Sequence, residues 1–314
     1  MKSLSLIQHP EYFQGEKKKS KSSPYFEGWY FKCTSLDSCI AFIIGIQITK
    51  QNKSSFIQVI TEESSYYFSF PIESFSFCQN PFQIKIEKNI FSFDTICVHL
   101  NNSDVCIKGR ATLKNHHFLQ KPFYAPNIMG PFSYLPFMEC NHAIVSMYHT
   151  VTGLFKINEN TFSFSEGVGY IEKDWGCSFP SSYVWCQANS FLSPQTNLFL
   201  SIATIPIGKF HFTGYICAFL WEGKEFLFTT YDQAKLVEKN IKKEQLSFHF
   251  SSGGYHLFVH SHYDKNQKLL APRCGEMNRY IKESITSPVS ITFQNQNSIV
   301  YSETCSKGGL EICW

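Results

Sequence analysis

The chain has 314 residues, a net charge of +3 and an aromatic content of 17%, with 31 Phe and 16 Tyr. This length allows one large β domain or two smaller ones, each able to bury a core without disulfides. The only strong basic cluster lies in a Ser-rich stretch at residues 17–21. No nucleic-acid-binding motif accompanies it, so nucleic acid is not the expected partner.

The N-terminal residues and the cysteines indicate a reducing compartment. Residues 1–10 lack the apolar run of a signal peptide, and the longest dense apolar stretch, residues 39–46, is too short to span a bilayer. The 12 cysteines form no C-x-x-C pair, and His116-His117 has no third ligand at metal-site spacing. We therefore expect a cytoplasmic protein with free thiols, no metal or cofactor, and at most peripheral membrane contact.

Residues 1–22 are expected to form a partly ordered leader, after which alternation of apolar and polar residues dominates. The alternating runs, typical of half-buried strands, lie at residues 68–70, 82–86, 162–164, 246–250 and 256–260. Gly253-Gly254 predicts a hairpin between the last two runs. Helical patterns are scarce, and residues 233–243 and 273–283 are the two candidates for short helices. The strand content predicts an all-β protein with two halves, residues 23–168 and 169–314.

Four segments dense in Trp, Tyr and Gly carry the most specific motifs. They are Y-F-E-G-W-Y-F-K at 25–32, P-N-I-M-G-P-F at 126–132 with E-C-N-H at 139–142, G-Y-I-E-K-D-W-G at 169–176 with Q-A-N at 187–189, and L-A-P at 270–272 with G-L-E at 309–311. In this order they resemble the tocopherol cyclase-like family. That family is related in fold to carotenoid 1,2-hydratases and other lipocalin-like double β-barrel proteins.

The resemblance implies two lipocalin-like β-barrel or sandwich halves packed around a shared apolar cavity. It also implies a cofactor-independent, acid-catalysed cyclisation of a prenylated phenol or quinol by protonation of an alkene. Such chemistry needs a carboxylic acid that an apolar pocket keeps protonated, and aromatic faces that stabilise a carbocation. The expected partner is a hydrophobic small molecule such as a prenyl-phenol, an isoprenoid or a lipid.

The candidate catalytic residues follow from the same motifs. The segment at 170–172 resembles the Tyr-x-Asp element of the hydratases, and on a strand Tyr170, Glu172 and Asp174 share one face. We expect Glu172 to be the acid, Asp174 and Tyr170 to modulate it, and His142 to orient or reprotonate it. The candidate substrate-binding residues are Glu27, Trp29, Tyr30, Asn127, Met129, Trp175, Trp185 and Gln187.

Each of these residues also has a purely structural interpretation. Residues 172–174 could form a surface turn with Lys173 solvated, Glu27 could be the structural partner of Lys32 or Arg279, and His142 could be a core histidine. At the level of function, the alternatives are a non-catalytic carrier of an isoprenoid or lipid, and an alkene hydratase. Residue types alone do not separate a carrier from a cyclase.

Overall fold

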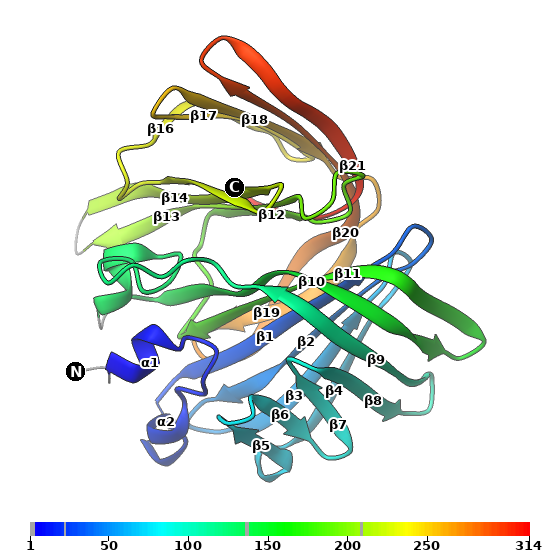
Figure 1. Ribbon diagram of the computed structural model, residues 1–314. Helices are drawn as coiled ribbons and strands as arrows, with labels where there is room; N and C mark the ends of the chain where they lie inside the picture. Colours follow the sequence, from blue (N-terminus) through cyan, green and yellow to red (C-terminus); the bar gives the residue numbers. More distant parts are fainter. Residues whose placement is uncertain (1–3, 22, 136–137, 208–209) are drawn as a thin grey trace. The chain divides into compact units, whose positions relative to one another are not determined.

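The computed structural model describes residues 4–21, 23–135, 138–207 and 210–314, and its strands form two large sheets (Figure 1). The predicted all-β class is confirmed. Helical structure in the described residues is confined to four short elements. These are α1 (Leu4–Gln8), α2 (Glu16–Lys21) and the 3-10 turns η1 (Ile72–Ser74) and η2 (Gly130–Tyr134). No helix in this described part is long and apolar enough to cross a membrane.

The first sheet contains the strands from residue 25 to residue 176. They are β1 (Tyr25–Thr34), β2 (Cys39–Ile48), β3 (Lys53–Ile60), β4 (Ser65–Pro71), β5 (Phe75–Cys78), β6 (Gln83–Ile86), β7 (Asn89–Ser92), β8 (Thr95–Asn101), β9 (Cys106–His117), β10 (Cys140–Ile157) and β11 (Asn160–Gly176). Their order is β4-β3-β2-β1-β11-β10-β9-β8-β7-β6-β5. β11 therefore lies between β1, which comes early in the chain, and its sequence neighbour β10.

The second sheet contains the strands from residue 183 onward. They are β12 (Tyr183–Ala188), β13 (Asn197–Ile207), β14 (Phe210–Trp221), β15 (Lys224–Thr229), β16 (Lys235–Ile241), β17 (Gln245–Ser252), β18 (Tyr255–His262), β19 (Gln267–Arg273), β20 (Glu276–Asn295) and β21 (Ser298–Cys313). Their order is β15-β14-β13-β12-β21-β20-β18-β17-β16, with β19 paired to β20.

The chain divides into two compact units, which we call unit 1 and unit 2. Unit 1 comprises Met1–Phe179 and Leu270–Tyr280, and unit 2 comprises Pro180–Leu269 and Ile281–Trp314. The position between residues 168 and 169, at which the sequence was divided, lies inside β11. The cavity expected between the two halves stays a prediction.

The predicted hairpin is confirmed and the two predicted helices are wrong. Ser252 pairs with Tyr255 across Gly253 and Gly254, which have φ of 56° and 86° as a type I′ turn requires. Residues 233–243 instead contain β16, and residues 273–283 contain the start of β20. The Lys and Glu in these segments favour helix only weakly, and ladder bonds to the neighbouring strands override that preference.

The core of unit 1 contains a buried ion pair. Lys173 on β11 and Glu27 on β1 are both 0% exposed, and Lys173 Nζ lies 2.5 Å from Glu27 Oε1. The same ammonium donates to the carbonyl oxygens of Pro10 and Tyr12, at 2.7 and 2.6 Å, and its three donors are thereby used. It also lies 4.7 Å from the ring centroid of Trp29. Burial lowers the pKa of Lys173, and the Glu27 carboxylate opposes that shift.

We predict that Lys173→Met lowers the free energy of unfolding by about 3–5 kcal/mol, because it leaves the Glu27 carboxylate buried without its cation. Urea denaturation measures the loss. Lys108→Met, at an exposed position of β9, is the matched control and should change stability by less than about 0.5 kcal/mol. Equal stability of the two variants would show that Glu27 is not held by this pair.

Candidate functional site

The two faces of β11 have different surroundings. Successive side chains of a strand point to opposite faces, and Ile171 and Trp175 belong to the hydrophobic core of unit 1. Tyr170, Glu172 and Asp174 therefore lie on the other face. The register with β1 is continuous through this segment, and it pairs Tyr30 with Glu172 and Trp29 with Lys173. Tyr30 thus shares the face of Glu172, whereas Trp29 shares the core face.

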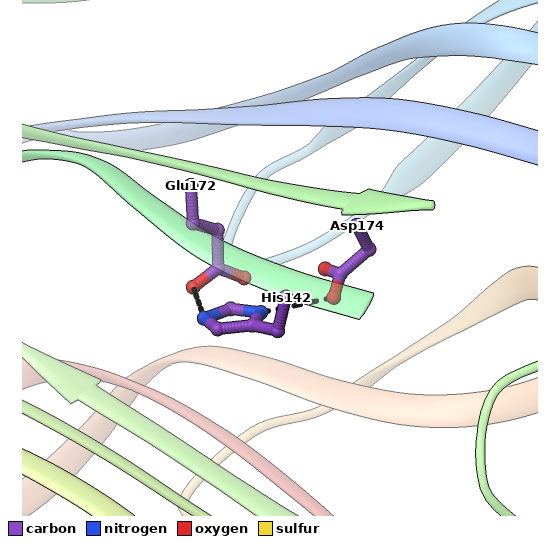
Figure 2. Close-up of side chains that lie close together, drawn as sticks. All are labelled: His142, Glu172 and Asp174. Atoms are coloured by element: carbon purple, nitrogen blue, oxygen red, sulfur yellow. Dashed lines mark hydrogen bonds and ion pairs between the residues drawn. The ribbon is translucent and has the colours of Figure 1, made fainter. Parts of the chain in front are cut away.

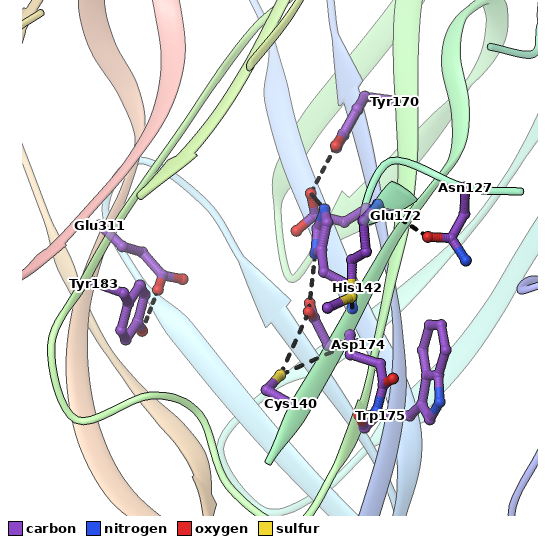
Figure 3. A network of polar contacts seen from close by, with 11 residues as sticks. Asn127, Cys140, His142, Tyr170, Glu172, Asp174, Trp175, Tyr183 and Glu311 are labelled. Carbon is purple, nitrogen blue, oxygen red and sulfur yellow. Dashed lines mark hydrogen bonds and ion pairs between the residues drawn. The ribbon is translucent and has the colours of Figure 1, made fainter. Parts of the chain in front are cut away.

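Tyr170, Glu172, Asp174 and His142 form one chain of polar contacts, which we call the His142 cluster (Figures 2 and 3). The Tyr170 hydroxyl donates to Glu172 Oε2 at 2.7 Å. The same carboxylate oxygen lies 3.8 Å from His142 Nε2, and His142 Nδ1 lies 2.9 Å from Asp174 Oδ1. The structure thus brings together all four residues for which the sequence predicts a catalytic role.

Strand pairing explains why His142 reaches both carboxylates. β10 runs antiparallel to β11, with His142 opposite Asp174 and Ile144 opposite Glu172. Side chains directly opposite each other on antiparallel strands are close neighbours, and the diagonal positions are also within reach of long side chains. Asp174 is therefore the direct neighbour of His142 and Glu172 is the diagonal one.

The Asp174 contact assigns the imidazole tautomer. A carboxylate only accepts hydrogen bonds, so Nδ1 of His142 carries a proton and donates it to Asp174. Nε2, on the other side of the ring, is left directed at Glu172 (Figure 2). A proton can therefore be held by either His142 Nε2 or the Glu172 carboxyl.

The surroundings favour a protonated His142. Burial by itself lowers the pKa of the imidazole, but the negative charges of Asp174 and Glu172 outweigh burial, and the net shift is upward. For Tyr170, burial and then the Glu172 charge raise the pKa well above its ordinary value, so the phenol stays a donor. The cluster can therefore store a proton next to a hydroxyl donor in a largely buried place.

Asn127 and Met129 lie in the loop that leads to β10. The Asn127 side-chain oxygen accepts from the Met129 backbone N–H at 2.9 Å and from the Ser133 hydroxyl at 2.6 Å. Met129 Sδ in turn lies 3.1 Å from the backbone N of His142. These residues shape the loop and set it against the backbone of the cluster.

Glu27, Trp29 and Trp175 are not brought to the His142 cluster. All three lie on the core face around Lys173, and the Glu27 carboxylate also accepts from the Tyr25 hydroxyl and the Gln14 backbone N–H. The partner of Glu27 is thus Lys173, and Lys173 is not solvated. We expected Trp29 and Trp175 to form an aromatic wall around Glu172. Instead, the sheet itself separates these two side chains from Glu172.

Trp185 and Gln187 lie on β12 in unit 2. Val184, Cys186 and Ala188 face the core of that unit, so Trp185 and Gln187 face the opposite side, where both are buried. An added Cβ on Gly309 would lie 2.5 Å from the Trp185 ring, which explains the glycine there. On the same face the Tyr183 hydroxyl donates to Glu311 Oε2 at 2.5 Å (Figure 3).

Sequence reasoning missed Cys140 as a member of the cluster. Its Sγ lies 3.9 Å from Asp174 Oδ1, and burial followed by the charge of Asp174 raises its pKa well above the ordinary value. The thiol is therefore a neutral neighbour of the carboxylate. The signal was present, because residues 140 and 142 share a face of any strand that contains both.

The cluster is also the one group in the described residues that offers three metal-ligand side chains within 4.8 Å of one another. As it stands, however, the imidazole lies between the two carboxylates, with a different ring nitrogen directed at each. An ion bound by all three side chains would need one ring nitrogen and both carboxylates to converge on one point. The present geometry fits a shared proton better.

More than half of the chain matches a known protein family. The family model described as tocopherol cyclase-like matches residues 120–313. The chain belongs to the tocopherol cyclase-like family. The predicted resemblance is thereby confirmed, and the matched residues include every member of the His142 cluster. No curated protein sequence matches the chain.

Solved structures similar to this tocopherol cyclase-like chain share its fold at low sequence identity. CghA matches with a TM-score of 0.56 and 11% identity over 92% of this chain and 88% of its own. CghA with Sch210972 matches with a TM-score of 0.53 and 12% identity over the same shares. Kievitone hydratase from Nectria haematococca matches with a TM-score of 0.51 and 9% identity over 96% of this chain and 93% of its own.

We predict a pH-dependent stability difference between the wild type and His142→Asn. Because the folded-state pKa of His142 is raised, the protonated ring stabilises the fold fully below the unfolded-state pKa of about 6.5. That stabilisation is lost as pH rises through the folded-state pKa. The difference in free energy of unfolding should therefore be largest near pH ~5.5 and smaller near pH ~9. Urea denaturation at both values measures it, with His99→Asn on the exposed side of β8 as the baseline. A difference that grows with pH would contradict the raised pKa.

Proposed function

We propose that this protein is a cofactor-free enzyme that protonates an alkene of a prenylated phenol or quinol and closes an oxygen ring. The observation that carries the proposal is the contact chain from Tyr170 through Glu172 and His142 to Asp174. Membership of a family named for tocopherol cyclase supports the reaction class. The proposal needs a proton held at a place shielded from water, and this chain provides one.

In the proposed reaction, protonated His142 first passes its Nε2 proton to Glu172, and Glu172 in its protonated form is then the acid. The Glu172 carboxyl gives its proton to the less substituted carbon of a trisubstituted alkene, which leaves a tertiary carbocation. The phenol oxygen of the same substrate attacks the cation and forms the C–O bond. The phenol proton then returns to the carboxylate. Atoms and charge balance without a co-reactant, so the overall reaction is an isomerisation.

The other members of the cluster would control the position of that proton. Asp174 fixes the ring orientation of His142, so that Nε2 faces Glu172 across 3.8 Å and can deliver or remove a proton between turnovers. Tyr170 donates to the Glu172 oxygen that faces His142 and stabilises the carboxylate left after transfer. Tyr30, the strand partner of Glu172, is an aromatic side chain on the same face, where it would lie against the cation.

Two other functions use the same site. A hydratase would trap the cation with water, and a structural neighbour named kievitone hydratase supports that variant. A carrier would bind the same apolar ligand without turnover, and the neighbour CghA with Sch210972 supports small-molecule binding on this fold. The cyclase is preferred because a carrier has no need for a chain of four titratable groups in contact, two of them, Tyr170 and Glu172, buried.

We predict that Glu172→Gln lowers turnover of a prenylated hydroquinone by about 10²–10⁴, because the amide keeps size and hydrogen bonding but has no proton to transfer. Chromatography of the chroman product measures it. Binding of the substrate should change little. The matched control is Glu303→Gln on β21, where Tyr301 donates to Glu303 Oε2 at 2.8 Å in the same Tyr-x-Glu arrangement.

The outcomes separate the functions. Wild-type turnover in Glu172→Gln would move the acid to Asp174, and wild-type turnover in Asp174→Asn as well would end the carboxylic-acid mechanism. A hydrated alcohol in place of the chroman would identify a hydratase. Tight binding of the hydroquinone without any product from the wild type would favour the carrier.

A further inference from the structure

The loop between β9 and β10 exposes aromatic side chains to solvent. Six Phe, Tyr or Trp side chains are exposed in the residues that the structure describes, and four of them lie in this loop. They are Phe118, Phe123, Tyr124 and Tyr134, and Phe123 is 87% exposed. Single exposed apolar side chains are normal, whereas a group of them in one segment indicates an interaction surface. We call residues 118–134 the aromatic loop.

Hydrogen bonds brace the tip of the aromatic loop. The Ala125 backbone N–H donates to the Pro122 carbonyl oxygen at 2.9 Å, which closes a β-turn. The Tyr134 hydroxyl donates to the Phe123 carbonyl oxygen at 2.7 Å. The rings of Phe123 and Tyr124 meet edge to face, with their centroids 6.3 Å apart. A braced turn therefore presents these two rings together at the surface.

The charge of this part of the chain has one sign. Residues 105–138 contain no Asp or Glu, although the whole chain has 25. The same stretch has four basic residues, which are Lys108, Arg110, Lys114 and Lys121. Lys121 lies in the aromatic loop beside α1 (Figure 1), where its Nζ is 3.4 Å from the Gln8 carbonyl oxygen and 3.8 Å from Glu11 Oε2. The exposed rings are thus accompanied by basic residues, and the loop itself contributes no negative charge.

The aromatic loop leads directly to the His142 cluster. Shortly after Phe123 comes Asn127, whose side-chain oxygen accepts from the Met129 backbone N–H at 2.9 Å. Met129 Sδ in turn lies 3.1 Å from the backbone N of His142. One short stretch of chain therefore connects the exposed rings to the site at which an apolar ligand is proposed to react.

We propose that the aromatic loop binds the surface of an anionic lipid bilayer, with Phe123 and Tyr124 at the boundary between headgroups and acyl chains. Aromatic rings are enriched at membrane–water interfaces, and basic residues near a bilayer are attracted to anionic headgroups. The loop has both kinds of side chain and no acid that such headgroups would repel. Uptake of a membrane-dissolved substrate at this loop rests on the proposed function, whereas the binding of lipid does not.

Sedimentation of the full chain with lipid vesicles tests the proposal. Vesicles of phosphatidylglycerol and phosphatidylcholine in equal parts should pellet the wild type, and vesicles of phosphatidylcholine alone should bind it more weakly. Transfer of one aromatic side chain into apolar surroundings is worth about tenfold in partitioning. The double variant Phe123→Ser/Tyr124→Ser should therefore lower the partition coefficient by about 10–100-fold. Lys121→Gln should lower it by about fivefold, and this loss should shrink as salt is added.

Two variants that remove an equally exposed apolar side chain elsewhere are the matched controls. Leu36→Ser changes the turn between β1 and β2, and Leu192→Ser changes the loop between β12 and β13. Their side chains are 81% and 88% exposed. Both variants should bind vesicles as the wild type does. A loss in either control as large as in the double variant would contradict the proposal, because binding would then depend on exposed apolar surface anywhere on the chain.

Three further results would overturn the proposal. The first is a wild type that stays in solution with both kinds of vesicle, and the second is a double variant that binds as the wild type does. The third is a dimer in analytical ultracentrifugation that Phe123→Ser/Tyr124→Ser converts to a monomer, because the aromatic loop would then be an interface between two copies of the chain. None of these measurements involves turnover. Vesicle binding by a protein without cyclase activity would therefore count against the proposed function alone.

Discussion

The pleat of β11 is the constraint on which the rest of unit 1 depends. Six consecutive residues, 170–175, alternate between a face with three acid or phenol groups and a core face with Ile171, Lys173 and Trp175. A shift of one residue would bury three acidic or phenolic groups in the core and expel a tryptophan from it. The register with β1 is continuous through this segment, and the register with β10 is continuous from Asp174 to Glu172, so the polar cluster lies on one side of β11 and the packed core on the other.

A lysine in the core is tolerated because every one of its donors is used. An isolated ammonium would cost several kcal/mol to bury. Lys173 meets one carboxylate, two carbonyl oxygens of the N-terminal segment and two indole faces. This arrangement ties residues 10–14 to the middle of the sheet, since Gln14 also donates to Glu27. The leader is therefore an integral part of unit 1 where it is described.

The two faces of β11 show how similar residue types take different roles. Glu27 and Glu172 are both buried, and each accepts from a tyrosine two residues earlier, at 2.7 Å in both cases. Glu27 faces a lysine, with which it forms a buried ion pair. Glu172 faces a histidine, the residue whose proton moves most easily near neutral pH. The partner on the neighbouring strand, rather than the acid itself, distinguishes the buried ion pair from the proposed catalytic acid.

The sequence by itself determined the all-β class, the family and the common face of Tyr170, Glu172 and Asp174, because period-two alternation and dense motifs are local properties. The same alternation was also sufficient to predict that Trp175 lies on the opposite face and that Cys140 lies on the face of His142. Only the tertiary structure decided that β1 and β10 flank β11, which brings His142 opposite Asp174 and Glu27 to Lys173. It also decided that residues 235–241 form a strand. These outcomes depend on pairing between segments that are far apart in the sequence. The free energy of that pairing outweighs the local preference for helix or strand, and it cannot be read from any single stretch of the chain.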